Sequence, residues 1–299
     1  MLAGIIPHKN ERSGRGDILE KFIPVKVTDK KWADRLLDGE VFMRPLHEFG
    51  SWNNNKDGSV ANQFRGDIHE GTAAVYGDTK QFPGIDGFPQ DLQNVVRQVS
   101  LIDNGDIQFF KIFSLYRMIY NPATDFFVKP DSRMKQFGDT AVIIRDYNEF
   151  IERFGLALFA KYNKVISMIS PVDFYGLQET KQTNPLFSKE KSYEYQNELR
   201  MAFCELEHDK FAIGPGADTA LSIVPSLDPV TLQIGSIRDI AIALPIDDFL
   251  DLKFPHDIRL RFPMRDPMEV PSNYDGIVQW TKEQMKDYHT ILAKTMFII

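Results

Sequence analysis

Two polar side chains, at positions 196 and 198, are of types that can do chemistry on a sugar. Gln196 and Glu198 stand directly before residues 199–203, where large apolar residues alternate with others as in a strand with one buried face. Residues i and i+2 of a strand point to the same face, so we expect Gln196 and Glu198 to project together into a cleft. A carboxylate beside a carboxamide can hold a sugar hydroxyl and orient an acceptor. The alternative is an edge strand whose polar residues are solvated.

Arg44 and Ser114 stand out for a similar reason. Arg44 ends a predicted strand over residues 40–44, immediately before Pro45, and Ser114 interrupts the large apolar residues of a strand predicted over 110–116. A guanidinium binds a diphosphate through a planar, permanently charged fork, and a serine hydroxyl orients a ribose or a carboxylate. A glutamate can stabilise the positive charge that develops on a sugar as its leaving group departs.

Each of these residues also has an ordinary structural interpretation. Arg44 can form a salt bridge at the end of its strand, and Ser114 can donate its buried hydroxyl to the backbone. Glu198 can pair with Arg200 or with Lys191. These alternatives stay open here, because spacing along the chain does not show whether the residues meet in space.

The chain order arginine, serine, glutamate resembles that of the Arg–Ser–Glu class of ADP-ribosyltransferases. The resemblance implies that Arg44 holds the diphosphate of NAD and that Ser114 supports the nicotinamide ribose. It implies that Glu198 is the catalytic glutamate and that Gln196 orients the acceptor. Tyr116, two residues after Ser114, is assigned to the same nucleotide site. The chain departs from the family pattern in having Phe-Ser-Leu in place of Ser-Thr-Ser, and no clear aromatic–Gly pair follows the arginine.

A second resemblance, from residue 20 to residue 245, is to an uncharacterised bacterial domain family found in mobile elements and in abortive infection. The shared pattern is an early short strand, an Asp-x-x-Glu turn at Asp67 and Glu70, a central strand with Ser114, and a late Glu-x-Arg that begins at Glu198. This resemblance implies no established activity. It points to the same residues and adds the two acidic residues of the turn.

Asp67, His69 and Glu70 form a separate candidate group. Asp67 and Glu70 carry the hard oxygen ligands that a divalent metal prefers. Further ligands for such a site are not apparent, so we predict no metal. Asp67 is then expected to cap the turn and Glu70 to pair with Arg65. A metal-dependent nuclease is the weakest functional hypothesis, also because the chain is acidic.

The composition is that of a globular protein with an acidic balance of charge. The chain has 299 residues, a formal net charge of −7 and 23 phenylalanines. This charge argues against a broad nucleic-acid footprint, although it is compatible with a local basic groove. The single cysteine, Cys204, rules out an intramolecular disulfide and suits a reducing compartment. Without a signal-peptide pattern or an apolar run of membrane-spanning length, we expect a cytoplasmic protein that does not associate with membranes.

Strand patterns outnumber helix patterns and do not alternate with them strictly, which is typical of an α+β fold with mixed or antiparallel sheets and few helices. The strongest helix is predicted over residues 147–162, and a short helix is expected to end at Gly39. An Asn-Gly turn within residues 103–106 predicts a hairpin. The polar residues 50–66 form a long loop, which is either mobile or a lid over a site.

The chain is expected to comprise a flexible arm at residues 1–17 and a single α+β domain over 18–299. A candidate sub-boundary lies near 208–218, where glycines and a proline interrupt the pattern. An amphipathic helix at 278–299 ends the chain. This helix either docks onto the domain or provides a surface for self-association or for a partner.

Two functional hypotheses follow from these observations. The first is an ADP-ribosyltransferase-like enzyme, a toxin or phage-defence effector, that binds NAD as its substrate and cleaves its N-glycosidic bond. Its acceptor, a protein or a nucleic acid, is not identified by the sequence. The second is a non-enzymatic ligand sensor or protein-interaction module of a defence system. An enzyme forms product from NAD, whereas a sensor shows only ligand-dependent stability.

Overall fold

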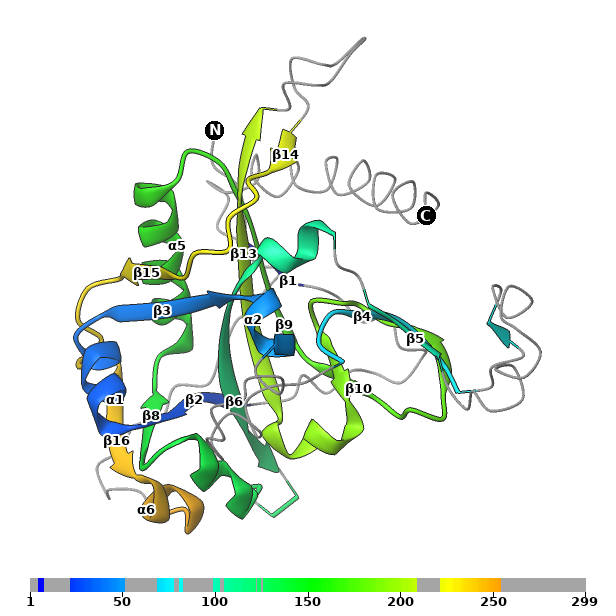
Figure 1. Cartoon of the computed structure of the whole chain (residues 1–299). Coiled ribbons are helices and arrows are strands. Elements are labelled where there is room, and N and C mark those ends of the chain that lie inside the picture. The colour runs from blue at the N-terminus through cyan, green and yellow to red at the C-terminus, as the bar shows by residue number, and fades with distance from the viewer. Residues whose placement is uncertain are drawn as a thin grey trace.

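The centre of the fold is a long, mostly antiparallel sheet in which β6 and β13 are neighbours (Figure 1). The computed structural model describes residues 5–7, 22–51, 69–77, 81–82, 99–102, 105–121, 123–124, 126–208 and 221–253. Within them, the main path of the sheet is β1 (Ile5–Pro7), β9 (Val165–Pro171), β13 (Glu198–His208), β6 (Lys111–Asn121), β2 (Phe22–Thr28), β8 (Thr140–Ile144) and β16 (Ala241–Pro245). Attached beside this path are β3 (Glu40–Pro45), β7 (Phe126–Phe127), β14 (Leu221–Ile223) and β15 (Val230–Gln233).

Two smaller sheets and several short helices complete the described part of the chain. One sheet contains β4 (Thr72–Tyr76), β5 (Val99–Ile102) and β11 (Thr180–Gln182), and the other pairs β10 (Asp173–Tyr175) with β12 (Ser188–Glu190). The helices are α1 (Lys30–Leu37), α2 (Leu46–Ser51), α5 (Tyr147–Lys161), α6 (Ile246–Leu250), and the 3-10 helices η4 (Asp106–Phe109), η5 (Ser132–Phe137) and η6 (Lys191–Gln196). The fold is α+β, as predicted. Of the described helices, none is long and apolar enough to cross a lipid bilayer.

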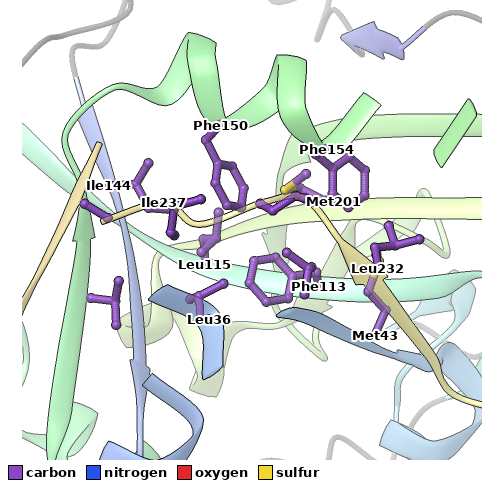
Figure 2. Close-up of a cluster of buried hydrophobic side chains, with 14 of the residues drawn as sticks. Leu36, Met43, Phe113, Leu115, Ile144, Phe150, Phe154, Met201, Leu232 and Ile237 are labelled. Carbon is purple, nitrogen blue, oxygen red and sulfur yellow. The ribbon is translucent and has the colours of Figure 1, made fainter. Parts of the chain in front are cut away.

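One face of the central strands forms an apolar core beneath α5. This core contains Met201 from β13, Phe113 and Leu115 from β6, and Phe150 and Phe154 from α5 (Figure 2). Each of these side chains is almost completely removed from water, which stabilises the fold by about 1.5–3 kcal/mol per side chain. The core holds the sheet from one side, so the opposite face of the same strands is the one that can carry polar residues.

The sheet divides at β6, and this division positions the candidate site. β6 pairs with β3 only at Lys111 and Ile112, and with β2 only at residues 116–119. Between these pairings, residues 113–115 pair with β13 on one edge and with neither β2 nor β3 on the other. β2 continues the sheet to β8 and β16, whereas β3 leads to β15, so two branches leave β6 (Figure 1).

The helix between the two branches, α1, ends just before Gly39, as the sequence predicts. This residue follows α1 and has a φ of +97°, and a Cβ atom built on it would lie 2.2 Å from the carbonyl oxygen of Gly235. Glycine suits both the left-handed backbone and the close approach. The tight turn allows β3 to begin at the next residue, Glu40.

Two further local predictions have opposite outcomes. The helix predicted over residues 147–162 is confirmed as α5. The hairpin predicted at residues 103–106 is wrong, because β5 pairs with β4 and the chain after Gly105 forms η4 before β6 begins. β5 pairs with β4, and β6 pairs with β13, β2 and β3 from distant parts of the chain, and such tertiary pairing outweighs a local turn signal.

Several predictions fall outside the described residues. They concern the loop at 50–66 beyond α2, the sub-boundary near 208–218 beyond the end of β13, and the helix at 278–299. Of the arm at 1–17, only residues 5–7 are described, and they pair in parallel with β9.

Phe154→Ala is expected to lower the free energy of unfolding by about 3–5 kcal/mol, because removal of a fully buried ring leaves a cavity beneath α5. Leu156 lies on the same helix but is 58% exposed, so Leu156→Ala is the matched control and should change stability by about 0.5 kcal/mol or less. Urea unfolding followed by circular dichroism measures both variants. Similar losses in the two variants would contradict the packing of α5 described above.

Candidate functional site

A pocket lies where β2 and β3 separate from β6. Its volume is about 280 Å³, and its walls come from β2, α1, β3, α2, β6, η5 and the segment that runs from β12 to the start of β13. Five of its lining residues are those that the sequence selected for chemistry: Arg44, Ser114, Tyr116, Gln196 and Glu198. The fold therefore brings together residues that are far apart along the chain.

The periodicity of β3 and α1 explains which side chains face the pocket. In β3, Glu40, Phe42 and Arg44 line the pocket, whereas the intervening Val41 and Met43 are buried in the apolar core. The lining residues of α1 are three and four positions apart, which places them on one face of the helix: Trp32, Arg35 and Leu36.

Ser114 and Glu198 are joined by a direct hydrogen bond in this pocket. Ser114 Oγ donates to Glu198 Oε1 at 2.5 Å. In the antiparallel pair of β6 and β13, Glu198 lies opposite Tyr116 and Ser114 lies opposite Arg200, so Ser114 and Glu198 are diagonal neighbours on one face. The serine hydroxyl therefore orients the carboxylate.

Glu198 belongs to a buried group of four charged side chains, here called the charged quartet: Glu70, Lys189, Glu198 and Arg200. Each member is 5% exposed or less. Arg200 donates from Nε to Glu198 Oε1 at 2.9 Å, and from Nη1 to Glu70 Oε1 and the Leu186 carbonyl, both at 2.6 Å. Lys189 Nζ lies 2.8 Å from Glu198 Oε2 and 3.9 Å from Glu70 Oε2. The formal charges cancel, which is the condition under which ionised groups tolerate burial.

The charged quartet keeps Glu198 ionised. Burial by itself raises the pKa of this carboxyl group, but the positive charges of Arg200 and Lys189 outweigh burial and hold its pKa well below the usual range. Burial likewise disfavours the charged form of Arg200, but Glu198 and Glu70 more than compensate and raise the pKa of the guanidinium. Glu198 is therefore a carboxylate at neutral pH, the form that can stabilise positive charge on a ligand.

The second oxygen of Glu198 faces the Lys189 ammonium. Glu198 Oε2 is buried and lies 2.8 Å from Lys189 Nζ, so this ion pair provides its partner. Because Glu198 lines the pocket, a hydroxyl group of a ligand can also donate to the carboxylate.

Gln196 reaches the pocket by a backbone path that differs from the predicted one. The sequence predicts a strand through Gln196 and Glu198, but Gln196 is the last residue of η6 and β13 begins at Glu198. Asn197 between them has a φ of 37°, in the left-handed region, and this residue turns the chain from helix into strand. Gln196 Oε1 accepts a hydrogen bond from Lys189 Nζ at 3.1 Å, which ties the amide to the charged quartet.

Arg44 and Tyr116 line the pocket in different environments. Arg44 forms an ion pair with Glu48 of α2, the salt bridge at the strand end that was its structural alternative, and its side chain is 41% exposed. Tyr116 is buried with its ring edge-on to Phe249, and burial raises the pKa of its phenol to about 12. Tyr116 is therefore neutral at physiological pH.

The lining residues that were not selected from the sequence include four large cationic or aromatic side chains: Lys26, Trp32, Arg35 and Phe42. Lys26 Nζ donates to the carbonyl oxygen of Ser114 at 2.8 Å, on the stretch of β6 that pairs with neither β2 nor β3. The sequence signals that can identify such residues are a lone lysine in an otherwise apolar strand, and a tryptophan and an arginine three positions apart on a helix.

The partners of the two buried glutamates differ in part from those expected. Glu198 pairs with Arg200, as its structural alternative proposed, but the lysine beside it is Lys189 rather than Lys191. Glu70 also pairs with Arg200, and its expected partner Arg65 lies outside the described residues.

Glu70 does not support the alternative of a divalent-metal site, because both of its carboxylate oxygens accept hydrogen bonds from Arg200. Asp67, its suggested co-ligand, lies outside the described residues. In the part of the chain that the structure describes, no group of three or more histidine, cysteine or acidic side chains is arranged to hold a metal ion.

Comparisons of the chain with models of protein families, with curated protein sequences and with solved structures found no match. Any ligand of the pocket must therefore be proposed from the residues that line it. These residues offer cations for an anionic ligand, aromatic side chains and an ionised carboxylate.

Arg200→Leu is expected to lower the free energy of unfolding by about 3–5 kcal/mol, because it leaves Glu70 and Glu198 buried with one cation between them. The control is Arg238→Leu, which breaks an exposed pair with Asp38 and should cost about 1 kcal/mol or less. Chemical denaturation measures both. If Arg200→Leu were as mild as its control, the charged quartet would not support the fold.

The low pKa of Glu198 is expected to make part of the stability depend on pH. The ordinary pKa of a glutamate is 4.5. Above that value the carboxylate stabilises the fold fully, and the stabilisation is lost as the pH falls toward the depressed pKa, because only the unfolded state binds the proton. The difference in free energy of unfolding between wild type and Glu198→Gln should therefore be constant from about pH 8 to 6 and shrink below about pH 5. Urea unfolding at stepped pH tests this, and a constant difference down to about pH 3 would contradict it.

Proposed function

We propose that this chain is an ADP-ribosyltransferase-like enzyme that binds NAD as a substrate and cleaves the bond between nicotinamide and ribose. The observation that carries the proposal is the Ser114–Glu198 hydrogen bond in a cation-lined pocket, where Glu198 is held ionised by Lys189 and Arg200. The arginine, serine and glutamate of the resemblance to the Arg–Ser–Glu class all line this pocket. The second resemblance, to domains of abortive infection, suggests action as a toxin or phage-defence effector.

The charge of the pocket supports binding of a diphosphate. Four cationic side chains line it against two carboxylates: Lys26, Arg35, Arg44 and Lys189 against Glu40 and Glu198. Arg44 is the best placed for a diphosphate, because its half-exposed guanidinium can bind two phosphate oxygens through its fork. Its ion pair with Glu48 is partly exposed, and partly exposed pairs are weak enough for a diphosphate to replace the carboxylate.

In the proposed reaction, the Glu198 carboxylate accepts a hydrogen bond from the 2′-hydroxyl group of the nicotinamide ribose. The C1′–N bond breaks, its electron pair leaves with nicotinamide, which departs as a neutral molecule, and the ribose becomes an oxocarbenium ion. The Glu198 carboxylate stabilises that positive charge, while Ser114 fixes the orientation of the carboxylate. A nucleophile of the acceptor then attacks C1′ and loses a proton. Water as the nucleophile yields free ADP-ribose.

Gln196 and Tyr116 complete the proposed site. The side chain of Gln196 lines the same pocket as Glu198 and is proposed to orient the acceptor nucleophile. Tyr116 lies opposite Glu198 on the neighbouring strand and is proposed to contact the nucleotide. The acceptor is proposed to be a protein or a nucleic acid.

A second candidate function, a non-enzymatic ligand sensor, is favoured by the burial of Glu198. The residue is 2% exposed and ion-paired with both Lys189 and Arg200, an arrangement that is common for carboxylates with a purely structural role. In a sensor, the same pocket would bind a nucleotide without turnover. The response to the ligand would then be a change in stability and no product.

The proposal is tested by measuring NAD affinity and nicotinamide release for wild type, Arg44→Ala and Glu198→Gln. Arg44→Ala should weaken NAD binding by about 10- to 100-fold, through loss of a charged hydrogen-bonding partner of the diphosphate. Glu198→Gln should keep most of the affinity but lose about 100-fold or more in the rate of release, because glutamine carries no charge to stabilise the oxocarbenium ion. Calorimetric titration and chromatography of nicotinamide provide the two readouts.

Arg238→Ala, an exposed arginine outside the pocket, is the matched control and should leave both readouts unchanged. Full release by Glu198→Gln would refute the proposed mechanism. NAD binding to wild type without any release would favour the sensor. The absence of NAD binding at millimolar concentrations would remove NAD as the ligand.

A further inference from the structure

Two exposed aromatic side chains stand together at the pocket, Trp32 of α1 and Phe42 of β3. They are 41% and 37% exposed, and their rings are stacked with centroids 6.3 Å apart and planes at 18°. Single exposed aromatic residues are common on protein surfaces and require no ligand to explain them. A stacked pair that lines a pocket differs, because whatever the pocket binds can contact both partly exposed rings.

Guanidinium groups lie over both rings of this pair. Arg35 Cζ is 4.8 Å from the centroid of the Trp32 ring, and Arg44 Cζ is 5.1 Å from the centroid of the Phe42 ring. Each arginine is also paired with a glutamate, which restricts where its planar group can lie. Aromatic rings combined with guanidinium groups favour flat aromatic ligands that carry negative charge, because stacking and charge then act together.

The strands bring these residues to one pocket. Arg44 pairs with Ile112 in the antiparallel pair of β3 and β6, and Phe42 lies two residues earlier on β3, about 6.6 Å away along the strand. Ser114 lies two residues beyond Ile112 on β6, so Phe42 and Ser114 are both on the same side of the Arg44–Ile112 pair. The aromatic pair, Arg44 and Ser114 all line the pocket, so a dinucleotide that fills it can contact all of them.

We propose that Trp32 and Phe42 form a base-stacking subsite that binds the purine of a dinucleotide, with Arg35 and Arg44 beside it. This inference rests on the proposed function, because it assigns the adenylate end of the same NAD molecule whose nicotinamide ribose lies at Ser114. The subsite gives the pocket a preference for dinucleotides, since a mononucleotide that lacks the adenylate half loses this contact.

The test compares three ligands of the full-length protein: NAD, nicotinamide mononucleotide, which lacks the adenylate half, and AMP, which is that half. Calorimetric titration gives the affinity of each for wild type, Trp32→Ala and Trp32→Phe. Trp32→Ala should weaken the binding of NAD and of AMP by about 5- to 100-fold and leave the affinity for nicotinamide mononucleotide unchanged. Trp32→Phe keeps a ring face and should recover most of the loss. Phe126→Ala removes an exposed aromatic side chain outside the pocket and should change no affinity.

The outcomes separate this inference from the proposed function. If Trp32→Ala weakens the binding of NAD and of the mononucleotide equally, or weakens the binding of neither, the base subsite is refuted. The role of Glu198 is tested separately, by nicotinamide release. Trp32-dependent binding of AMP without nicotinamide release from NAD supports the subsite and refutes the enzyme. A wild-type protein that binds none of the three ligands refutes both. If circular dichroism shows that Trp32→Ala is unfolded, Phe42→Leu removes the other ring and carries the same expectations.

Discussion

The burial of the Arg200 guanidinium is the constraint on which the rest of the site depends. A guanidinium does not lose its proton inside a protein, so burying it costs on the order of several kcal/mol unless acceptors surround it. The acceptors here are Glu198, Glu70 and the carbonyl oxygen of Leu186, from three separate segments of the chain. All three segments must be in place together before the charge of Arg200 is satisfied. The requirement fixes the turn before β4, the chain before β12 and the start of β13 relative to one another.

The strand that carries this constraint also connects the core to the pocket. Because β13 alternates its side chains, Glu198 and Arg200 share one face while Met201 is held in the apolar core on the other. The neighbouring β6 repeats this arrangement, and its Ser114 lies diagonally across from Glu198. The pocket opens beside this pair because β2 and β3 leave β6 on either side of residues 113–115. The packing that stabilises the sheet thus also determines where the carboxylate points.

Site residues that interrupt a regular sequence pattern are easier to predict from the sequence than the residues that they contact in the fold. Ser114 in an apolar strand and Arg44 at a strand end could be selected from spacing alone, and both line the pocket. The backbone at Gln196 could not be predicted, because a single left-handed residue, Asn197, ends a 3-10 helix there and no periodicity signals it. The pairing of Glu70 with Arg200 could not be predicted either, since 130 positions separate the two residues and only the tertiary fold brings them together.

The ion pairs of the pocket divide into two classes, and the division follows exposure. Two ion pairs lie beside the Trp32 and Phe42 rings: Arg44 with Glu48, and Arg35 with Glu40. Both pairs are partly exposed, so each contributes only about 0–1 kcal/mol to stability, and a negatively charged ligand can replace the carboxylate at small cost. The pairs of Glu198 are buried, and breaking them would leave an uncompensated charge in the interior. A ligand can therefore rearrange the arginines as it enters, whereas the carboxylate that it meets stays ionised and in place. This combination, adaptable cations beside a fixed anion, suits a ligand that brings negative phosphates and develops positive charge on a sugar.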